Sequence, residues 1–100
     1  MTEQLLHLIE KRDKDNPIQS REIEKAVQVS GSEVRSIIHE LRLSGHPIAS
    51  DSNGYYMAGN EDELGHTIAQ LKSRGNKIFQ VANVLEKCFK NEPQLQLFQG

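Results

Sequence analysis

The strongest constraint on this chain is a heptad repeat of apolar and small residues in its second half. These residues follow one another at alternating spacings of four and three, and they are Leu64, Ile68, Leu71, Gly75, Ile78, Ala82, Leu85 and Phe89. An α-helix brings residues at these spacings onto one stripe. We therefore expect one helix from about Asn60 to Lys90, with a weak point or bend at Gly75-Asn76. The remaining fold must then be built from residues 1–59.

Two uses of this apolar stripe are open. The helix could fold back on its own domain, or two copies of the chain could pair through it. Because the repeat is longer than packing on so small a domain requires, we expect a homodimer. The residues expected in its interface are Leu64, Ile68, Leu71, Ile78, Leu85 and Phe89. Beyond Gly75 the apolar face widens, and residues 72–90 carry five cationic side chains against one carboxylate, a net charge of +4.

Residues 1–59 contain three short amphipathic segments that are typical of helices. They run from Thr2 to about Lys14, from Ser20 to about Val29, and from Ser30 to Ser44-Gly45. Ser20 is the expected N-cap of the second segment, and Ser30 with Glu33 has the spacing of a capping box at the third. Ile18 is a lone apolar residue between turn signals, so it suits a very short strand.

A β-hairpin is expected after the third helix. Ile48–Ser50 and Tyr55–Met57 are short enough for two strands, and Asn53-Gly54 between them is the dipeptide that best tolerates a tight hairpin turn. Tyr55 and Tyr56 are neighbours on a strand and must point to opposite faces. We expect one of them in the core and the other at the surface.

Composition excludes several classes of function. Of 100 residues one is cysteine, so an internal disulfide and a cysteine-based zinc site are ruled out, and the scattered histidines predict no metal site. The start of the chain lacks the pattern of a secretory signal, and no apolar run is long enough to span a membrane. We therefore expect a cytoplasmic protein. No catalytic constellation or phosphate-binding loop is present, so we expect neither an enzyme nor a cofactor.

The run VSGSEVRSIIHELRLSGHPIASDSNGYYMA, residues 29–58, resembles the recognition helix and wing of the winged-helix superfamily. Together with the charged helix behind it, the run is similar to small winged-helix DNA-binding proteins of phages and prophages. The resemblance implies a mainly α fold with a small β-hairpin: a winged helix-turn-helix domain over 1–59, a long C-terminal helix over 60–90 and a flexible tail over 91–100.

Double-stranded DNA is the partner that this resemblance implies, bound by a transcriptional regulator or an accessory protein of DNA replication. A recognition helix needs short polar and cationic side chains on its outer face to reach base edges and phosphates. Arg35 is the best candidate to bond a guanine edge, and Arg42 is placed for a phosphate. The expected DNA-contacting residues are Ser32, Arg35, Ser36, His39, Arg42, Ser52, Asn53 and Tyr55.

The charge balance departs from that of strong DNA binders. The whole chain has a net charge of −2, and residues 19–59 carry four cations against five acids. Phosphate contacts depend on cations, so this balance keeps a second hypothesis open. In that hypothesis the same fold is an adaptor or inhibitor that docks on a host replication or transcription protein.

The C-terminal tail resembles the short peptide by which bacterial proteins bind the sliding clamp. Gln94, Leu95, Leu97 and Phe98 are the residues that match, and an extended peptide after Pro93 would place its apolar end in a pocket. The last four residues, Leu97 to Gly100, also resemble the remnant of a protease cleavage site. Both readings stay open from the sequence.

Overall fold

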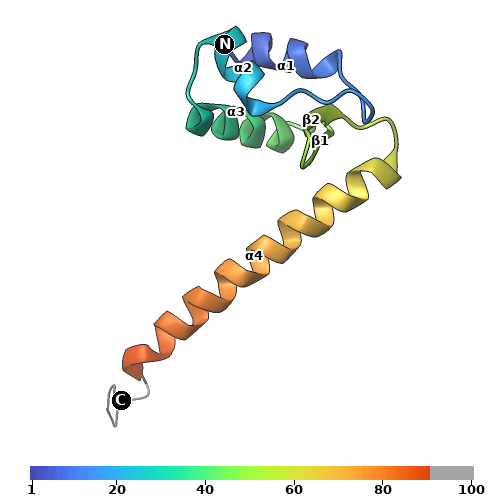
Figure 1. The fold of residues 1–100 in the computed structure, drawn as a ribbon. Coiled ribbons are helices and arrows are strands. Elements are labelled where there is room, and N and C mark those ends of the chain that lie inside the picture. The colour runs from blue at the N-terminus through green and yellow to red at the C-terminus, as the bar shows by residue number, and fades with distance from the viewer. Residues whose placement is uncertain (91–100) are drawn as a thin grey trace. The chain divides into compact units, whose positions relative to one another are not determined.

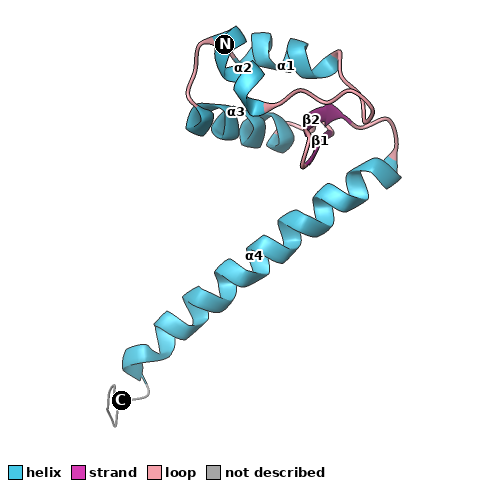
Figure 2. Cartoon of the chain, in the orientation of Figure 1, coloured by secondary structure: helices cyan, strands magenta, loops and turns pink. Residues whose placement is uncertain are grey.

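The structure is a computed structural model that describes residues 1–90, which form four α-helices and one two-stranded sheet (Figures 1 and 2). In chain order they are α1 Thr2–Glu10, α2 Ser20–Val27, α3 Gly31–Leu43, β1 Ile48–Asp51, β2 Gly54–Met57 and α4 Glu61–Lys90. The prediction of a mainly helical chain with a small hairpin and a long C-terminal helix is confirmed.

The chain divides into two units, and the division lies inside α4. Residues Met1–Thr67 form the first, which we call unit 1. Ile68–Lys90 is the described part of the second, which we call the distal α4 segment. The sequence predicted a domain over 1–59 followed by a long helix, whose heptad repeat begins at Leu64. In the structure the first two turns of that helix, through Thr67, belong to unit 1.

Unit 1 is built around one hydrophobic core to which each of its helices and strands contributes. Its most buried side chains are Leu5, Ile9, Ile18, Ile23, Val34, Ile38 and Ile48, and Tyr55 and Met57 of β2 pack against them. Ala49 and Tyr56, which are cross-strand partners, are buried outside this cluster. In each helix the buried residues recur three or four positions apart, as in α3, where Val34, Ile38 and Leu41 are buried. The amphipathic spacing in the sequence therefore predicted the core-facing side of all three short helices.

Side chains at the helix N-termini fix where α2 and α3 begin. The capping box at α3 is as predicted: the Glu33 amide donates to Ser30 Oγ (3.1 Å), and the Ser30 amide donates to Glu33 Oε1 (3.0 Å). Ser20 was wrong as the N-cap of α2, because the helix already includes it and Gln19 is the cap. The Ser20 hydroxyl instead donates to Glu24 Oε2 (2.9 Å) inside the helix.

The hairpin turn is one residue earlier than predicted. In the observed register Asp51 pairs with Gly54, so Ser52 and Asn53 form the turn and Gly54 begins β2. Gly54 has a φ of +138°, and a β-carbon there would collide with the carbonyl oxygen of Ile18. Glycine is thus required at position 54 for two reasons, the close approach of Ile18 and the positive φ.

Both edges of the hairpin are closed by other parts of unit 1. On the β2 side, the amides of Ile18 and Tyr55 each donate to the carbonyl of the other (2.8 Å both), which confirms the very short strand predicted at Ile18. On the β1 side, Thr67 of α4 replaces a strand. Its Oγ1 accepts from the Ser50 amide (3.0 Å) and donates to the Ser50 carbonyl (3.2 Å). No main-chain hydrogen-bonding group of Tyr55 or Ser50 is therefore left open at the sheet edge.

Helix α4 begins where the sequence predicted. The Glu63 amide donates to the Asn60 side chain (3.0 Å), and the Glu63 carboxylate accepts from the Gly59 amide (2.8 Å). The three acids of its first turn are favourable near a helix N-terminus. The helix is continuous through Gly75 to Lys90. The first turns are tied to unit 1 by Thr67, which is 3% exposed.

Replacing Thr67 by valine should destabilise unit 1 by about 1–3 kcal/mol. Valine keeps the shape of threonine but leaves the Ser50 amide and carbonyl without their partner. Urea unfolding followed by circular dichroism measures the change. Thr67→Ser keeps the hydroxyl and should lose clearly less stability; an equal loss in the two variants would contradict this role of the hydroxyl.

Tyr56 should make unit 1 less stable at alkaline pH. Burial raises the pKa of Tyr56 above its ordinary value of 10.0, and the nearby carboxylates of Asp51 and Glu63 raise the pKa further. The unfolded chain therefore ionises first, so stability is intact below pH 10 and falls as the pH rises beyond it. Unfolding midpoints from about pH 8 to about pH 11 should fall less in Tyr56→Phe. The same fall in both proteins would refute this assignment.

Candidate nucleic-acid interface

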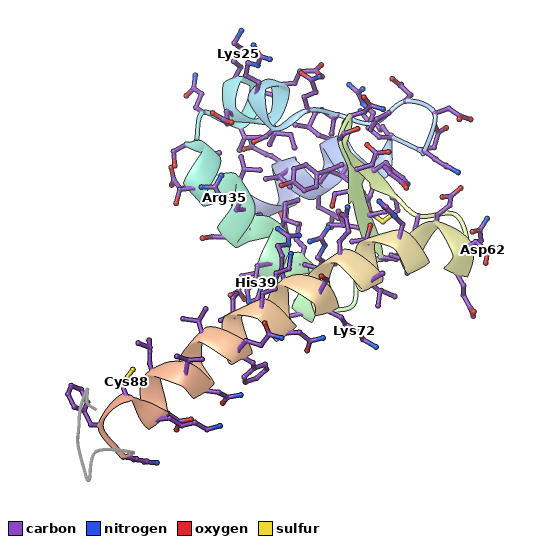
Figure 3. The ribbon with its side chains drawn as sticks, turned by 60° about the horizontal axis from the view of Figure 1, so that its bottom comes forward. Lys25, Arg35, His39, Asp62, Lys72 and Cys88 are labelled. Atoms are coloured by element: carbon purple, nitrogen blue, oxygen red, sulfur yellow. The ribbon has the colours of Figure 1, made fainter. Side chains whose placement is uncertain are left out.

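Helix α3 has one buried and one exposed face. Val34, Ile38 and Leu41 enter the core, whereas the predicted contact residues Ser32, Arg35, Ser36 and His39 are all exposed. Arg35 and His39 lie one helical turn apart on α3 (Figure 3). The sequence assigned these four residues to the outer face, and the structure brings them together there. A helix with such a face offers hydroxyl, guanidinium and imidazole groups to a partner.

Close to Arg35 lies a carboxylate from the preceding helix. A β-carbon built on Gly31 would be 3.3 Å from Glu24 Oε2 and 3.8 Å from Arg35 Nη1, so both charged groups border the start of α3. Glu24 therefore lowers the positive potential that Arg35 offers to an anion. Sequence reasoning missed this neighbour, because the contact joins two helices and depends on the tight turn at Gln28, which has a positive φ of 61°.

Arg42 binds the hairpin. Its Nε donates to the Ile48 carbonyl (2.9 Å), and Nη2 lies 3.3 Å from Ser50 Oγ. The side chain is half-buried, so α3 and β1 are joined by the same guanidinium. The sequence placed Arg42 on the outer face for a phosphate contact. In the structure it satisfies the β1 edge beside Thr67, and a phosphate contact by Arg42 stays a prediction.

At the hairpin tip, the residues expected at a wing are accessible. Ser52 and Asn53 are exposed, and the Asp51 carboxylate accepts from the Asn53 amide (2.7 Å), which holds the turn. The two tyrosines lie on opposite faces, as predicted: Tyr56 is 4% exposed on the face that carries Ala49, and Tyr55 is half-buried and packs against the core cluster. Tyr55 is thus only partly available to a partner.

Several carboxylates of residues 19–59 are engaged in local hydrogen bonds. Glu22 accepts from the Gln19 amide (3.3 Å), and Glu33 accepts from the Ser30 amide, both at helix N-termini. The positive end of a helix dipole offsets part of such a charge. Glu40 on α3 is exposed. The helix dipoles therefore offset part of the charge of Glu22 and Glu33, whereas Glu24 still lowers the potential at the start of α3.

Other chemistry can be judged for the part of the chain that the structure describes. Within residues 1–90, no group of three or more histidine, cysteine, aspartate or glutamate side chains could hold a metal ion. No helix in that range is long and apolar enough to cross a membrane. The clamp-peptide residues Gln94, Leu95, Leu97 and Phe98 lie outside the described residues.

The expected dimer residues differ in exposure. Leu64 is half-buried within unit 1. The others are all exposed, from 41% at Leu71 to 76% at Phe89. Leu43, at the end of α3, is a further large apolar residue at the surface, 71% exposed. Because Leu43 lies outside the heptad stripe, the sequence did not indicate that it belongs to a binding surface.

Comparison of the chain with protein-family models, with curated proteins and with solved structures found no match in any of the three.

The two arginines of α3 should differ in their effect on stability. Arg42→Ala should cost about 1–3 kcal/mol, because it leaves the part-buried Ile48 carbonyl without a partner. Arg35→Ala should change stability by no more than about 0.5 kcal/mol, because its side chain is exposed. Urea unfolding of the two variants checks this, and a larger loss in Arg35→Ala would be inconsistent with the contacts.

Proposed function

We propose that unit 1 is a winged-helix domain that binds double-stranded DNA, with α3 as its recognition helix and the hairpin as its wing. The order of elements supports the fold: three helices, a one-residue strand at Ile18 between the first two, and a hairpin after the third. The observation that carries the function is the exposed polar and cationic face of α3, from Ser32 to His39, opposite its buried face. The major groove admits a helix with such a face.

Within this proposal the residues have different tasks. Arg35 is placed to bond a base edge, while Ser32, Ser36 and His39 reach phosphates or bases from the same face. Ser52 and Asn53 at the wing tip contact the backbone or the minor groove. Arg42 supports these contacts by fixing the hairpin to α3. The protein would act as a regulator of transcription or an accessory of replication.

The distal α4 segment gives this function a second part, a homodimer. Two copies joined through α4 would offer two recognition helices to one DNA site, as dimeric binders do. The support for this is the stripe of exposed apolar side chains from Ile68 to Phe89. Exposed apolar surface of this extent commonly marks an interaction site.

A specific observation also favours the second candidate, docking on another protein. Leu43 is exposed beside a surface that carries Glu40, and residues 19–59 have more acids than cations. An exposed apolar side chain near an acid suits a protein surface better than DNA. If the protein docks on another protein, Leu43→Asp should abolish partner binding and leave the fold intact. If it binds DNA, the same substitution should change DNA affinity by no more than about twofold, because one added charge repels DNA only weakly.

The DNA proposal is tested by fluorescence anisotropy of a labelled mixed-sequence duplex at low and at physiological salt. We expect affinity to fall steeply with salt, and Arg35→Ala to weaken binding about tenfold. Lys14→Ala is the matched control, because it removes the same charge from the loop between α1 and α2. The absence of binding even at low salt, or equal weakening in the two variants, would overturn the proposal.

A further inference from the structure

The distal α4 segment has more exposed apolar surface than a solitary helix in water normally carries. Its exposed large apolar residues are Ile68, Leu71, Ile78, Phe79, Val81, Val84, Leu85 and Phe89, with exposed fractions between 41% and 76%. Unit 1 ends at Thr67, so this surface belongs to the helix alone. The side chains at each heptad position determine which partner helix would fit this surface, and in which direction.

We propose that two copies of the distal α4 segment pair in antiparallel orientation, with their twofold axis at the level of Gln80, which is itself an f position outside the seam. This inference rests on the homodimer of the proposed function and specifies its geometry. In heptad terms, Ile68, Gly75, Ala82 and Phe89 occupy a positions. Leu71, Ile78 and Leu85 occupy d positions. In an antiparallel pair a residues face d residues of the other copy, and in the proposed register this applies to Gly75, Ala82 and Phe89.

Side-chain size favours this orientation. With Gln80 at the centre, Gly75 faces Leu85 of the other copy, and Ala82 faces Ile78 of the other copy. Each small residue thus meets a large one, twice in the dimer. A parallel pair would place Gly75 against Gly75 and Ala82 against Ala82, which leaves two layers of the seam unfilled. Nothing lies within 4 Å of the position of a β-carbon on Gly75, so that side is open in the single chain.

The residues at the e and g positions, which flank the seam, also favour the antiparallel orientation. Phe79 (an e position) and Val81 (a g position) lie next to the centre, so in the antiparallel pair each meets its own copy across the twofold axis. Lys72 and Glu86, the other e positions of this segment, then lie opposite each other near both ends of the pair. In a parallel pair g positions meet e positions, so Arg74 would face Phe79 and Val81 would face Glu86. At the e positions the antiparallel pair thus separates apolar from charged contacts, and at the g positions Arg74 faces Cys88 of the other copy.

Charge complementarity fixes the register. Glu86 is the only acid among residues 68–90, and the described residues offer neither Glu86 nor Lys72 an ion pair. A shift of one heptad in either direction would oppose Phe79 to Lys72 or to Glu86. Only the register centred on Gln80 pairs the acid with a cation twice. Lys72 and Cys88, labelled in Figure 3, lie near the two ends of the part of α4 that pairs. Val84 is exposed but lies outside the seam, at a c position.

A charge exchange tests this arrangement in the full chain. Lys72→Glu and Glu86→Lys each place like charges opposite each other, so each variant alone should self-associate about fivefold more weakly. Mixed together, the two variants regain both attractive pairs and should form mainly heterodimers. Lys77→Glu mixed with Glu86→Lys is the matched control, because the net charges are the same and residue 77, a c position, lies outside the seam. Energy transfer between differently labelled copies measures the pairing.

Each outcome decides a separate claim. Heterodimers that form in the first mixture and not in the control support the antiparallel pair. A dimer whose pairing is the same in both mixtures overturns the orientation and leaves the homodimer of the proposed function in place. A chain that stays monomeric in analytical ultracentrifugation overturns both, while DNA binding by unit 1 is measured independently by anisotropy.

The distance between labels gives a second and independent measurement. In a Cys88→Ser background, a nitroxide on Gln70→Cys reports the separation of the two copies of residue 70. In the antiparallel pair these positions should lie about 30 Å apart along the helix axis, at 1.5 Å per residue. In a parallel pair they are level, within about 20 Å of each other. A short distance alone would overturn the proposal.

Discussion

The outer edge of β1 is the constraint on which the arrangement of unit 1 depends. A hairpin of two four-residue strands is marginal by itself, and its open edge exposes main-chain groups that need partners. Arg42 supplies one from α3 and Thr67 supplies two from α4, while Ile18 closes the opposite edge. The contacts of Thr67 and Ile18 join residues that are 17 and 37 positions apart, whereas Arg42 and Ile48 are six positions apart. They hold the hairpin next to α3 and make the start of α4 part of unit 1.

This arrangement has a direct consequence for the proposed function. A recognition helix and a wing can read DNA together only if their relative position is fixed, and Arg42 fixes it from within. Among the exposed residues from Ser32 to His39, only Glu33 takes part in a structural contact, the capping box with Ser30. Division of tasks between the arginines of α3 follows: Arg42 is structural, and Arg35 faces outward.

Local patterns in the sequence predicted most of the fold, because apolar spacing and capping residues act within one helical turn. The capping box at Ser30, the strand at Ile18 and the continuous helix over 60–90 were all predicted in this way. What could not be predicted depends on contacts between distant segments. The approach of Ile18 determines where Gly54 lies in the hairpin, and the β1 edge draws Arg42 away from the outer face. Glu24 approaches Arg35 only because α2 and α3 pack together.

Whether α3 and the hairpin tip bind DNA is measured by the amide chemical shifts of labelled protein titrated with a duplex. We expect the changes in chemical shift to cluster in residues 31–39 and 51–54 and to saturate together. Shifts confined to the cationic residues 72–90 would contradict the proposal, since binding would then belong to α4. A spectrum that does not change on addition of DNA would contradict it as well.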